Sequence, residues 1–307
     1  MSQYIRKCGL IVSGGNDIID LSELHIKFEV RQDDKESPNN AKMRVYNLSK
    51  ETQNRVIESS RVDLTAGYND IAGIIFSGDI IQFKIGKENS TDTYLEILAA
   101  DGDIVYNNAV INTSIPSGQN TTQASIAAIA NSMGLSATVV GGHFGGTLPR
   151  GKVLWGMAKN SARSIADANK YTWSINGQEL RFIGVGDYLP NAAVSLNSST
   201  GLIGVPEQTE EGIKLRCLIN PLIVSGGLIK LDNTTINQTI QQKNFTRIIG
   251  QQPYDKRTGN QLLASIAADG LYRVYVIEHV GDNRGIEWYS EITALTVNES
   301  TGKVVAL

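Results

Sequence analysis

The 307-residue sequence predicts a mainly β fold in which two related antiparallel β domains flank a small α+β domain. Two observations indicate a duplication, because internal repetition constrains the architecture of a chain. The hexapeptide Leu-Ile-Val-Ser-Gly-Gly occurs at Leu10–Gly15 and again at Leu222–Gly227. The strand-hairpin-strand stretch Ile80–Ile97 also aligns without a gap with Tyr275–Ile292. A third observation, the Ala-rich helical pattern in the middle of the chain, separates the two copies.

The two repeats keep their order along the chain. The hexapeptides are 212 residues apart and the hairpins 195, so the second copy is 17 residues shorter between the landmarks. That pattern favours a divergent tandem duplication with one loop deletion. The alternative is two unrelated apolar strands that each end in a Gly-Gly turn, as strand composition favours. The hairpin alignment places Gly86 on Gly281, Tyr94 on Tyr289, Glu96 on Glu291 and Ile97 on Ile292.

The composition is that of an ordinary soluble globular protein, with 41% hydrophobic and 19% charged residues. A formal charge of −3 provides no basic footprint for nucleic acid. Cys8 and Cys217 lie in predicted strands, so we expect buried free thiols and no disulfide framework. The start of the chain has no apolar signal core, and no apolar run is long enough to span a bilayer. We therefore expect the chain to remain in the cytoplasm in which it is made.

The first β domain is predicted over residues 1–112. Apolar and polar residues alternate over 24–30, the period of a half-buried strand. Ser49 is placed to cap a short helix over 50–59. The predicted strands cover 8–30 (two strands around the Gly14-Gly15 turn), 41–46, 62–67, 74–86 and 91–100.

The middle α+β domain is predicted over residues 113–194. Thr121 or Thr122 caps a helix that runs to Met133, and Gly134 supplies a left-handed stop. The remaining elements are a strand at 137–140, a Gly-rich loop at 141–146, a helix over 153–169, and a hairpin of 171–175 and 179–183 around a type I′ Asn176-Gly177 turn. Trp155, at the start of the second helix, and Trp173, in the hairpin, are expected in the core of this domain.

The second β domain is predicted over residues 195–307. Its strands cover 214–219 and 222–231, separated by Pro221, and a closing hairpin covers 272–281 and 285–297. The domain contains a long polar insertion at 232–270, and a loop of that length is either functional or disordered until bound.

No local pattern of residues indicates catalysis. His25 and His279 lie on predicted strands, where we expect them on the polar face, and His143 lies in the Gly-rich loop. No Cys or His has a second ligand at metal spacing, and no G-x-S-x-G, H-E-x-x-H or phosphate-loop motif is present. Asp101 and Asp103 flank Gly102, which a tight turn explains better than a carboxylate site. We therefore expect no enzyme, no metal and no cofactor.

Several short motifs along the chain resemble phage baseplate hub proteins, especially the hubs of contractile tails. The motifs of the first domain resemble the N-terminal barrel of that family, and those of the second resemble its later domain. They are Ser-Pro-Asn-Asn-Ala (37–41), Val-Tyr-Asn-Leu-Ser (45–49), Leu-Thr-Ala-Gly-Tyr (64–68), Phe-Ser-Gly-Asp-Ile (76–80), Ala-Asp-Gly-Asp (100–103), Thr-Gly-Leu-Ile-Gly-Val-Pro (200–206), Leu-Ile-Asn-Pro-Leu (218–222) and His-Val-Gly-Asp-Asn-Arg-Gly (279–285).

The resemblance implies a homotrimer at the centre of a virion tail baseplate, assembled in the host cytoplasm. Each chain of such a hub carries two tube-like antiparallel β-barrels, so three chains present a pseudo-sixfold ring. The ring joins the hexameric tail tube to a trimeric spike and contacts other baseplate proteins, while DNA passes only as cargo. Closed rings also cover exposed barrel edges.

Candidate interface residues follow from this resemblance and from their positions near the closing hairpin or within the long insertion. The pair Trp288 and Tyr289 is either core or a subunit contact. Contacts are also predicted at the hairpin tip Asp282, Asn283 and Arg284, and at Asn244 and Phe245 within the insertion, which is expected to act as a contact arm.

Three other functions stay open at this level. The same mechanics suit the hub of a contractile injection system or a tailocin. A tail-associated cell-wall hydrolase requires a clustered acid pair or a metal site. A carbohydrate-binding adhesin requires exposed aromatic platforms, which an aromatic content of 7% hardly supports.

Overall fold

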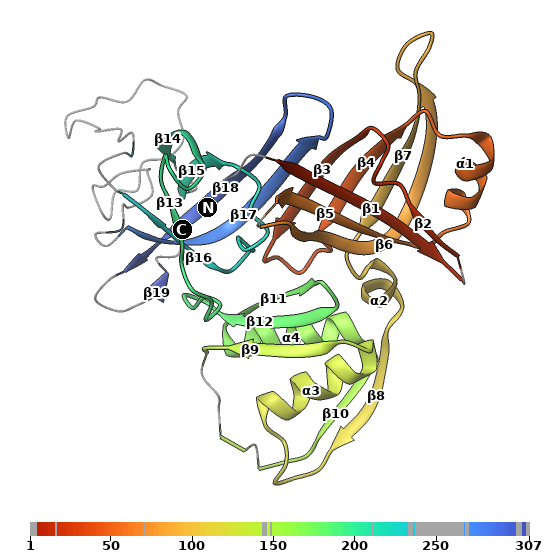
Figure 1. Ribbon diagram of the computed structural model, residues 1–307. Coiled ribbons are helices and arrows are strands. Elements are labelled where there is room, and N and C mark those ends of the chain that lie inside the picture. The colour runs from red at the N-terminus through yellow and green to blue at the C-terminus, as the bar shows by residue number, and fades with distance from the viewer. Residues whose placement is uncertain are drawn as a thin grey trace, which may run out of the picture.

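The protein consists of two β-rich parts and a middle part that lies below them in Figure 1. We call them the first β part (residues 6–100), the middle part (103–184) and the second β part (194–304). The fold is described from a computed structural model. It describes residues 5–15, 17–69, 71–142, 146–147, 149–209, 212–232, 236, 267, 270–298 and 303–304.

The first β part follows the predicted alternation closely. In β3 the buried side chains are every second residue, from Ile26 to Gln32, so one face of the strand meets the core. The hydroxyl of Ser49 accepts a hydrogen bond from the backbone N–H of Thr52 and caps α1 as predicted. The elements are β1 (Arg6–Gly14), β2 (Asp17–Asp20), β3 (Ile26–Asp33), β4 (Asn40–Tyr46), α1 (Lys50–Ile57), β5 (Arg61–Tyr68), β6 (Gly73–Lys87) and β7 (Thr93–Ala100).

The middle part is α+β, as predicted. Thr121 caps α3 through a hydrogen bond from the N–H of Ala124, and Gly134 ends the helix with a φ of 67°. Helices α3 and α4 pack between a two-stranded and a three-stranded sheet (Figure 1). The elements are α2 (Asp103–Asn108), β8 (Val110–Ile115), α3 (Thr122–Met133), β9 (Ser136–Val140), β10 (Lys152–Met157), α4 (Ala158–Asn169), β11 (Tyr171–Asn176) and β12 (Glu179–Gly184).

Two details of the middle part differ from the prediction. Trp155 lies on strand β10 instead of opening a helix, and its side chain is 78% exposed, whereas Trp173 is buried as expected. The hairpin turn is Gly177-Gln178 and not Asn176-Gly177. Both central residues have positive φ, 60° and 71°, so the type I′ geometry was predicted correctly but one residue too early.

The second β part continues the sheet of the first. The elements are β13 (Val194–Leu196), β14 (Leu202–Thr209), β15 (Gly212–Cys217), β16 (Leu228–Leu231), β17 (Leu271–Asp282), β18 (Trp288–Asn298) and β19 (Lys303–Val304). Together the two β parts form one 14-stranded sheet with the main path β14-β15-β18-β17-β3-β4-β7-β6-β5-β1-β2. The path is open, so the pairing of the described strands does not by itself establish two closed barrels.

The strand order of the two β parts is the same. In the first, neighbours in space run β1-β5-β6-β7-β4-β3, and in the second they run β13-β16-β17-β18-β15-β14. Each strand of one series therefore has a counterpart in the other, and the counterparts also follow one another in the same order along the chain. The match has one exception in direction, since β1 and β5 are antiparallel while β13 and β16 are parallel.

The two closing hairpins correspond in detail. A β-bulge interrupts the β6–β7 pairing at Ile81 and the β17–β18 pairing at Tyr275. Counted from the bulges, Gly281 corresponds to Lys87 and not to Gly86, because the second hairpin loop has one residue more. The predicted hairpin alignment is thus correct for the second strands and one residue out along the first strands.

The repeated hexapeptide is not part of this correspondence. Leu10–Gly15 covers the end of β1 and its turn, but Leu222–Gly227 forms turns and no strand. The predicted strand over 222–231 is reduced to β16, whose counterpart is β5 and not β1. The recurrence of the six letters therefore reflects apolar and Gly-Gly composition, and the duplication depends on the hairpins and the strand order.

Candidate assembly surface

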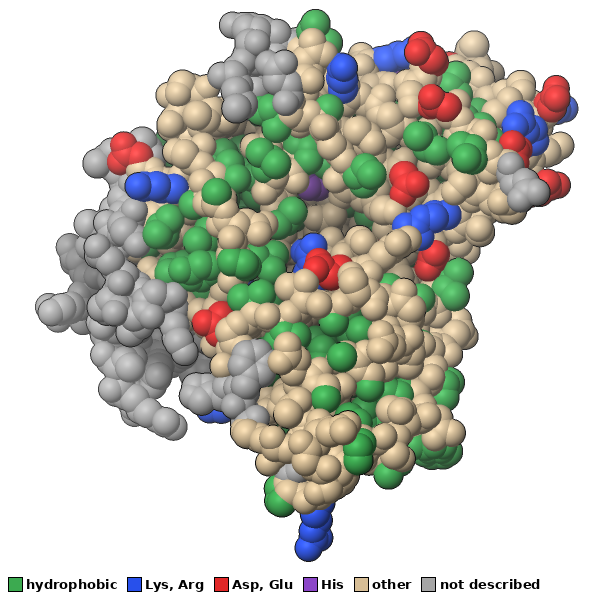
Figure 2. All heavy atoms as spheres, turned by 60° about the horizontal axis from the view of Figure 1, so that its bottom comes forward, with side chains coloured by type: hydrophobic (Ala, Val, Ile, Leu, Met, Phe, Trp, Pro, Cys, Tyr) green, Lys and Arg blue, Asp and Glu red, His purple; other side chains and the backbone are tan. Residues whose placement is uncertain are grey.

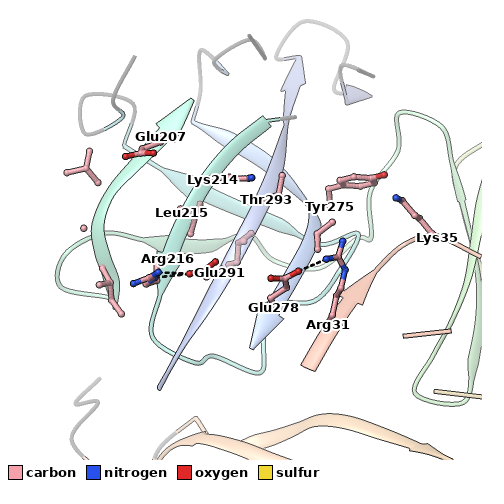
Figure 3. A pocket seen from close by; sticks show the side chains of 15 residues that line it. Arg31, Lys35, Glu207, Lys214, Leu215, Arg216, Tyr275, Glu278, Glu291 and Thr293 are labelled. Atoms are coloured by element: carbon pink, nitrogen blue, oxygen red, sulfur yellow. Dashed lines mark hydrogen bonds and ion pairs between the residues drawn. The ribbon is translucent and has the colours of Figure 1, made fainter. Parts of the chain in front are cut away.

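Charged side chains line one face of the joined sheet. Over β14, β15, β18, β17 and the end of β3 this face is hollowed into an open trough of about 710 Å³. Arg216 points toward Glu291, and Arg31 points toward Glu278, each as a hydrogen-bonded ion pair (Figure 3). The lining includes Arg31, Lys35, Glu207, Lys214, Arg216, Tyr275, Glu278 and Glu291.

A group of four side chains on this face occurs twice. In the first β part, Arg44 of β4 donates from Nε to Glu96 of β7 at 2.5 Å. Its guanidinium lies over the ring of Tyr94, 4.7 Å from the centroid, and Lys42 approaches the same carboxylate at 3.7 Å. A planar guanidinium can make both a directed hydrogen bond and a stacking contact, which an ammonium cannot do.

The second β part repeats the group on the corresponding strands. Arg216 of β15 donates to Glu291 of β18 at 2.5 Å, and its guanidinium lies 4.3 Å from the ring centroid of Tyr289. Lys214 precedes Arg216 by two residues, as Lys42 precedes Arg44. The real mark of the duplication is therefore Lys-x-Arg on one strand opposite Tyr-x-Glu-Ile on its neighbour. This pattern is present in the sequence, but a search for identical hexapeptides does not find it.

The pairs Arg44–Glu96 and Arg216–Glu291 differ in burial, and therefore in the strength of their electrostatic interaction. Burial alone raises the pKa of Glu96, but the hydrogen bond from Arg44 and the charges of Lys42 and Lys84 outweigh it, so the pKa is lowered. The Glu96 side chain is only 7% exposed, whereas that of Glu291 is 45% exposed. Because solvent screens exposed pairs, the Arg44–Glu96 contact contributes more to strand register than Arg216–Glu291 does.

The tip of the closing hairpin binds the first β part of the same chain. Asp282 accepts from the imidazole of His25 at 2.8 Å, with Lys27 nearby at 3.7 Å. Asn283 bonds both to the N–H of Ile26 and to the carbonyl oxygen of Leu24. Arg284 donates to the carbonyl of Glu23 and Arg6 to the carbonyls of Gly285 and Ile286. Asp282, Asn283 and Arg284 thus lie at a junction within the chain, and a role for them between subunits stays a prediction.

Trp288 and Tyr289 lie on opposite faces of β18. Trp288 is 2% exposed and packs edge-on against Phe28 at 5.4 Å, inside the hydrophobic cluster of the first β part. The ring of Tyr289 lies on the charged face, with the guanidinium of Arg216 stacked over it. Trp288 is therefore a core residue, the first of the two options predicted for it, and it joins the two β parts.

The remaining predicted residues divide between buried positions and undescribed ones. His279 is not on the polar face, because it is buried, bonds to Ser290 at 2.7 Å, and has its pKa lowered to about 4 by burial. Cys8 and Cys217 are free thiols; Cys217 is buried as predicted, whereas Cys8 is only partly buried, and burial raises the pKa of each to about 12. Asn244, Phe245, His143 and most of the insertion 232–270 lie outside the described residues.

The described residues contain neither a cluster suited to a metal ion nor a helix that could cross a membrane. Asp101 does not form half of a carboxylate pair. It is buried and accepts a hydrogen bond from the N–H of Gly177 at 2.6 Å, which ties the middle part to the sheet. Charges of both signs lie beside one another on the face drawn in Figure 2, with hydrophobic side chains between them.

Solved structures of tail proteins have a similar fold. A type VI secretion component from Escherichia coli, c3393, described as similar to T4 tail proteins gp27 and gp5, aligns with a TM-score of 0.58 at 12% identity, covering 97% of this chain and 79% of that one. A tail protein from Neisseria meningitidis aligns at 0.56 with 9% identity over 95% and 96%. The 43 kDa tail protein of prophage MuSo2 from Shewanella oneidensis aligns at 0.55 with 8% identity over 94% and 97%. The fold is that of tail and baseplate proteins.

The family itself follows from the sequence match. The family described as "Baseplate hub gp41" matches residues 5–255, and the chain belongs to it. Among curated proteins none matches the chain. Membership confirms the predicted resemblance to baseplate hubs and implies a structural component of a virion tail. It supports a structural role in a tail baseplate.

Proposed function

We propose that this chain is the hub subunit of a contractile tail baseplate and assembles as a homotrimer. Each chain contributes two related sheet segments, which close as barrel-like units, so three chains form a ring with pseudo-sixfold symmetry. One side of the ring meets the hexameric tail tube, and the other carries a trimeric spike. The chain connects the sixfold symmetry of the tube to the threefold symmetry of the spike and has no catalytic role.

The observation that carries this proposal is the duplicated strand order of the two β parts. Two copies of one six-strand topology, each with the same Lys-x-Arg and Tyr-x-Glu group, supply two equivalent contact units per chain. Cyclic symmetry with three subunits then provides six such units. The family assignment independently indicates a baseplate hub.

The charged face suits a passage for DNA rather than a binding site for it. Along this face Arg31, Arg44 and Arg216 are each paired with a glutamate. Tight binding of DNA depends on unpaired cations that displace counterions from phosphates. Pairing of these three arginines with glutamates reduces the positive charge that the face offers to phosphates, which suits passage of DNA as cargo.

A second candidate is the hub of a contractile injection system. The observation that favours it is the similar fold of the type VI secretion component. The ring and its contacts are the same in both cases, and the genes on either side of the coding sequence distinguish them.

The oligomeric state tests the proposal. A purified chain of 33.3 kDa should give a particle of about 100 kDa in mass photometry and in light scattering at micromolar concentration. A particle that remains a monomer as the concentration rises to 100-fold above that range would contradict the homotrimer.

A further inference from the structure

Among the described strands, residues 81–87 of β6 leave one edge unpaired, whereas the corresponding residues of β17 pair with β3. We propose that residues 81–87 of β6 pair antiparallel with β14 of a second copy of this chain, in the way β17 pairs with β3. This inference rests on the ring proposed above and names the contact that closes it. Its partner is thus another copy of the same chain, bound by strand addition.

The template is the junction between the two β parts. Strand β17 is divided along its length: residues 271–273 pair with β16, and residues 276–282 pair with β3. The counterpart strand β6 is divided in the same place. Residues 73–79 pair with β5, while residues 81–87 pair, among the described strands, with β7 only.

Burial distinguishes the paired segment from the unpaired one. Ile277 and His279 of β17 are 0% and 1% exposed. Ile277 packs in the hydrophobic cluster of the second β part, whereas His279 lies opposite Val30 of the first β part. Counted from the bulges, the counterpart of His279 on β6 is Ile85, which is 59% exposed. Ile85 therefore lacks the cover that the same position receives from β3 inside the chain.

Strand β14 has matching properties. It is the counterpart of β3, and among the described strands it pairs with β15 only. Its Ile203 and Val205 are 37% and 53% exposed, and Glu207 lies on the same strand. The segment 81–87 carries Lys84 and Lys87, and Glu207 gives β14 a charge of opposite sign, so an antiparallel pairing can place Lys84 and Glu207 as diagonal neighbours on one face.

The template also fixes the register. Glu278 faces Arg31 in the junction, and Glu278 corresponds to Lys84 because both stand opposite the repeated glutamate of the neighbouring strand. Arg31 corresponds to Thr209. Lys84 should therefore face Thr209 of the second copy, and by the same counting Gly86 should face Glu207.

Disulfide cross-linking tests this register. Directly opposed residues in an antiparallel pair have Cα atoms roughly 4.5–5.5 Å apart, which a disulfide can bridge. The double variant Lys84→Cys/Thr209→Cys should form disulfide-linked dimers and trimers, which a reductant should convert back to single chains on a denaturing gel. The native thiols interfere little, because burial raises the pKa of Cys8 and Cys217 to about 12 and keeps them protonated.

Two further variants serve as controls. Lys84→Cys/Gln208→Cys shifts one partner by a residue, which turns its side chain to the other face, and should cross-link at least ~10-fold less. Arg31→Cys/Glu278→Cys should form the corresponding bond within one chain. Cross-linking of the shifted pair as efficiently as the aligned pair would overturn the register.

A substitution without cysteines tests the same contact. Ile85→Asp should weaken self-association by ~100-fold or more, whereas Ile18→Asp, at a 72% exposed position on β2, should leave it within about 2-fold. Circular dichroism melts verify that both variants fold. A trimer that forms with neither cross-link nor sensitivity at Ile85 overturns the strand pairing and leaves the hub function standing. A chain that remains monomeric overturns both.

Discussion

Replacing Trp288 by alanine should destabilise the junction between the two β parts. The indole is buried in the core of the first β part and contacts Phe28. A buried Trp removes roughly 150–250 Å² from water, which at about 25 cal/mol per Å² is roughly 4–6 kcal/mol. The indole Nε1–H makes no hydrogen bond among the described residues, and that unsatisfied donor costs roughly 1–3 kcal/mol. Trp288→Ala should therefore lower the free energy of unfolding by about 3–5 kcal/mol.

Urea unfolding followed by circular dichroism measures this loss. Trp155→Ala is the matched control, because Trp155 is 78% exposed and its removal should change the free energy by less than about 0.5 kcal/mol. Trp288→Phe keeps an aromatic ring beside Phe28 and removes the unsatisfied donor, so it should cost less than about 1.5 kcal/mol. If Trp288→Ala were as stable as Trp155→Ala, the junction would not depend on this side chain.

Three other predictions follow from buried or paired charges. Burial raises the pKa of Asp101 to about 6, so its ionisation costs the folded state stability between about pH 4 and 6, up to about 3 kcal/mol. Asp101→Asn should remove that loss, and unfolding curves at pH 4 and 8 compare the two chains; an unchanged pH dependence would refute the assignment. Arg273→Met should leave the buried carboxylate of Asp34 without its cation and lower the free energy of unfolding by about 3–5 kcal/mol. The double variant Asp34→Leu/Arg273→Met should recover most of that free energy, and failure to recover it would count against the ion-pair explanation. Double-mutant cycles should give a coupling of about 1.5–3 kcal/mol for Arg44 with Glu96 and less than about 1 kcal/mol for Arg216 with Glu291, and the reverse order would contradict the role of burial.

The sequence was most informative where local chemistry decides the structure. The caps Ser49 and Thr121 and the stop at Gly134 are in place, because each satisfies a helix end through its own side chain or φ angle. The baseplate hub family was also recognised from sequence. The duplication was inferred partly from the wrong repeat, because identical apolar letters at Leu222–Gly227 say nothing about strand pairing.

Tertiary context decided the features that sequence could not predict. The hydrophobic side chain of Trp155 was predicted to lie in the core, but its position on a two-stranded sheet leaves it exposed to solvent. His279 was expected on the polar face, but the pairing of β17 with β3 buries it. The tip residues Asp282 to Arg284 were predicted from loop position alone, which does not tell whether the partner is another chain or an earlier part of the same one.

Cryo-electron microscopy of the assembled particle, viewed along its axis, determines whether the chain forms the proposed ring. Three chains should surround a channel with six similar sheet segments, alternately the first and second β parts, and with β6 of each chain beside β14 of the next. A ring in which the two β parts do not alternate as equivalent segments would contradict the proposed hub, as would a particle without a ring.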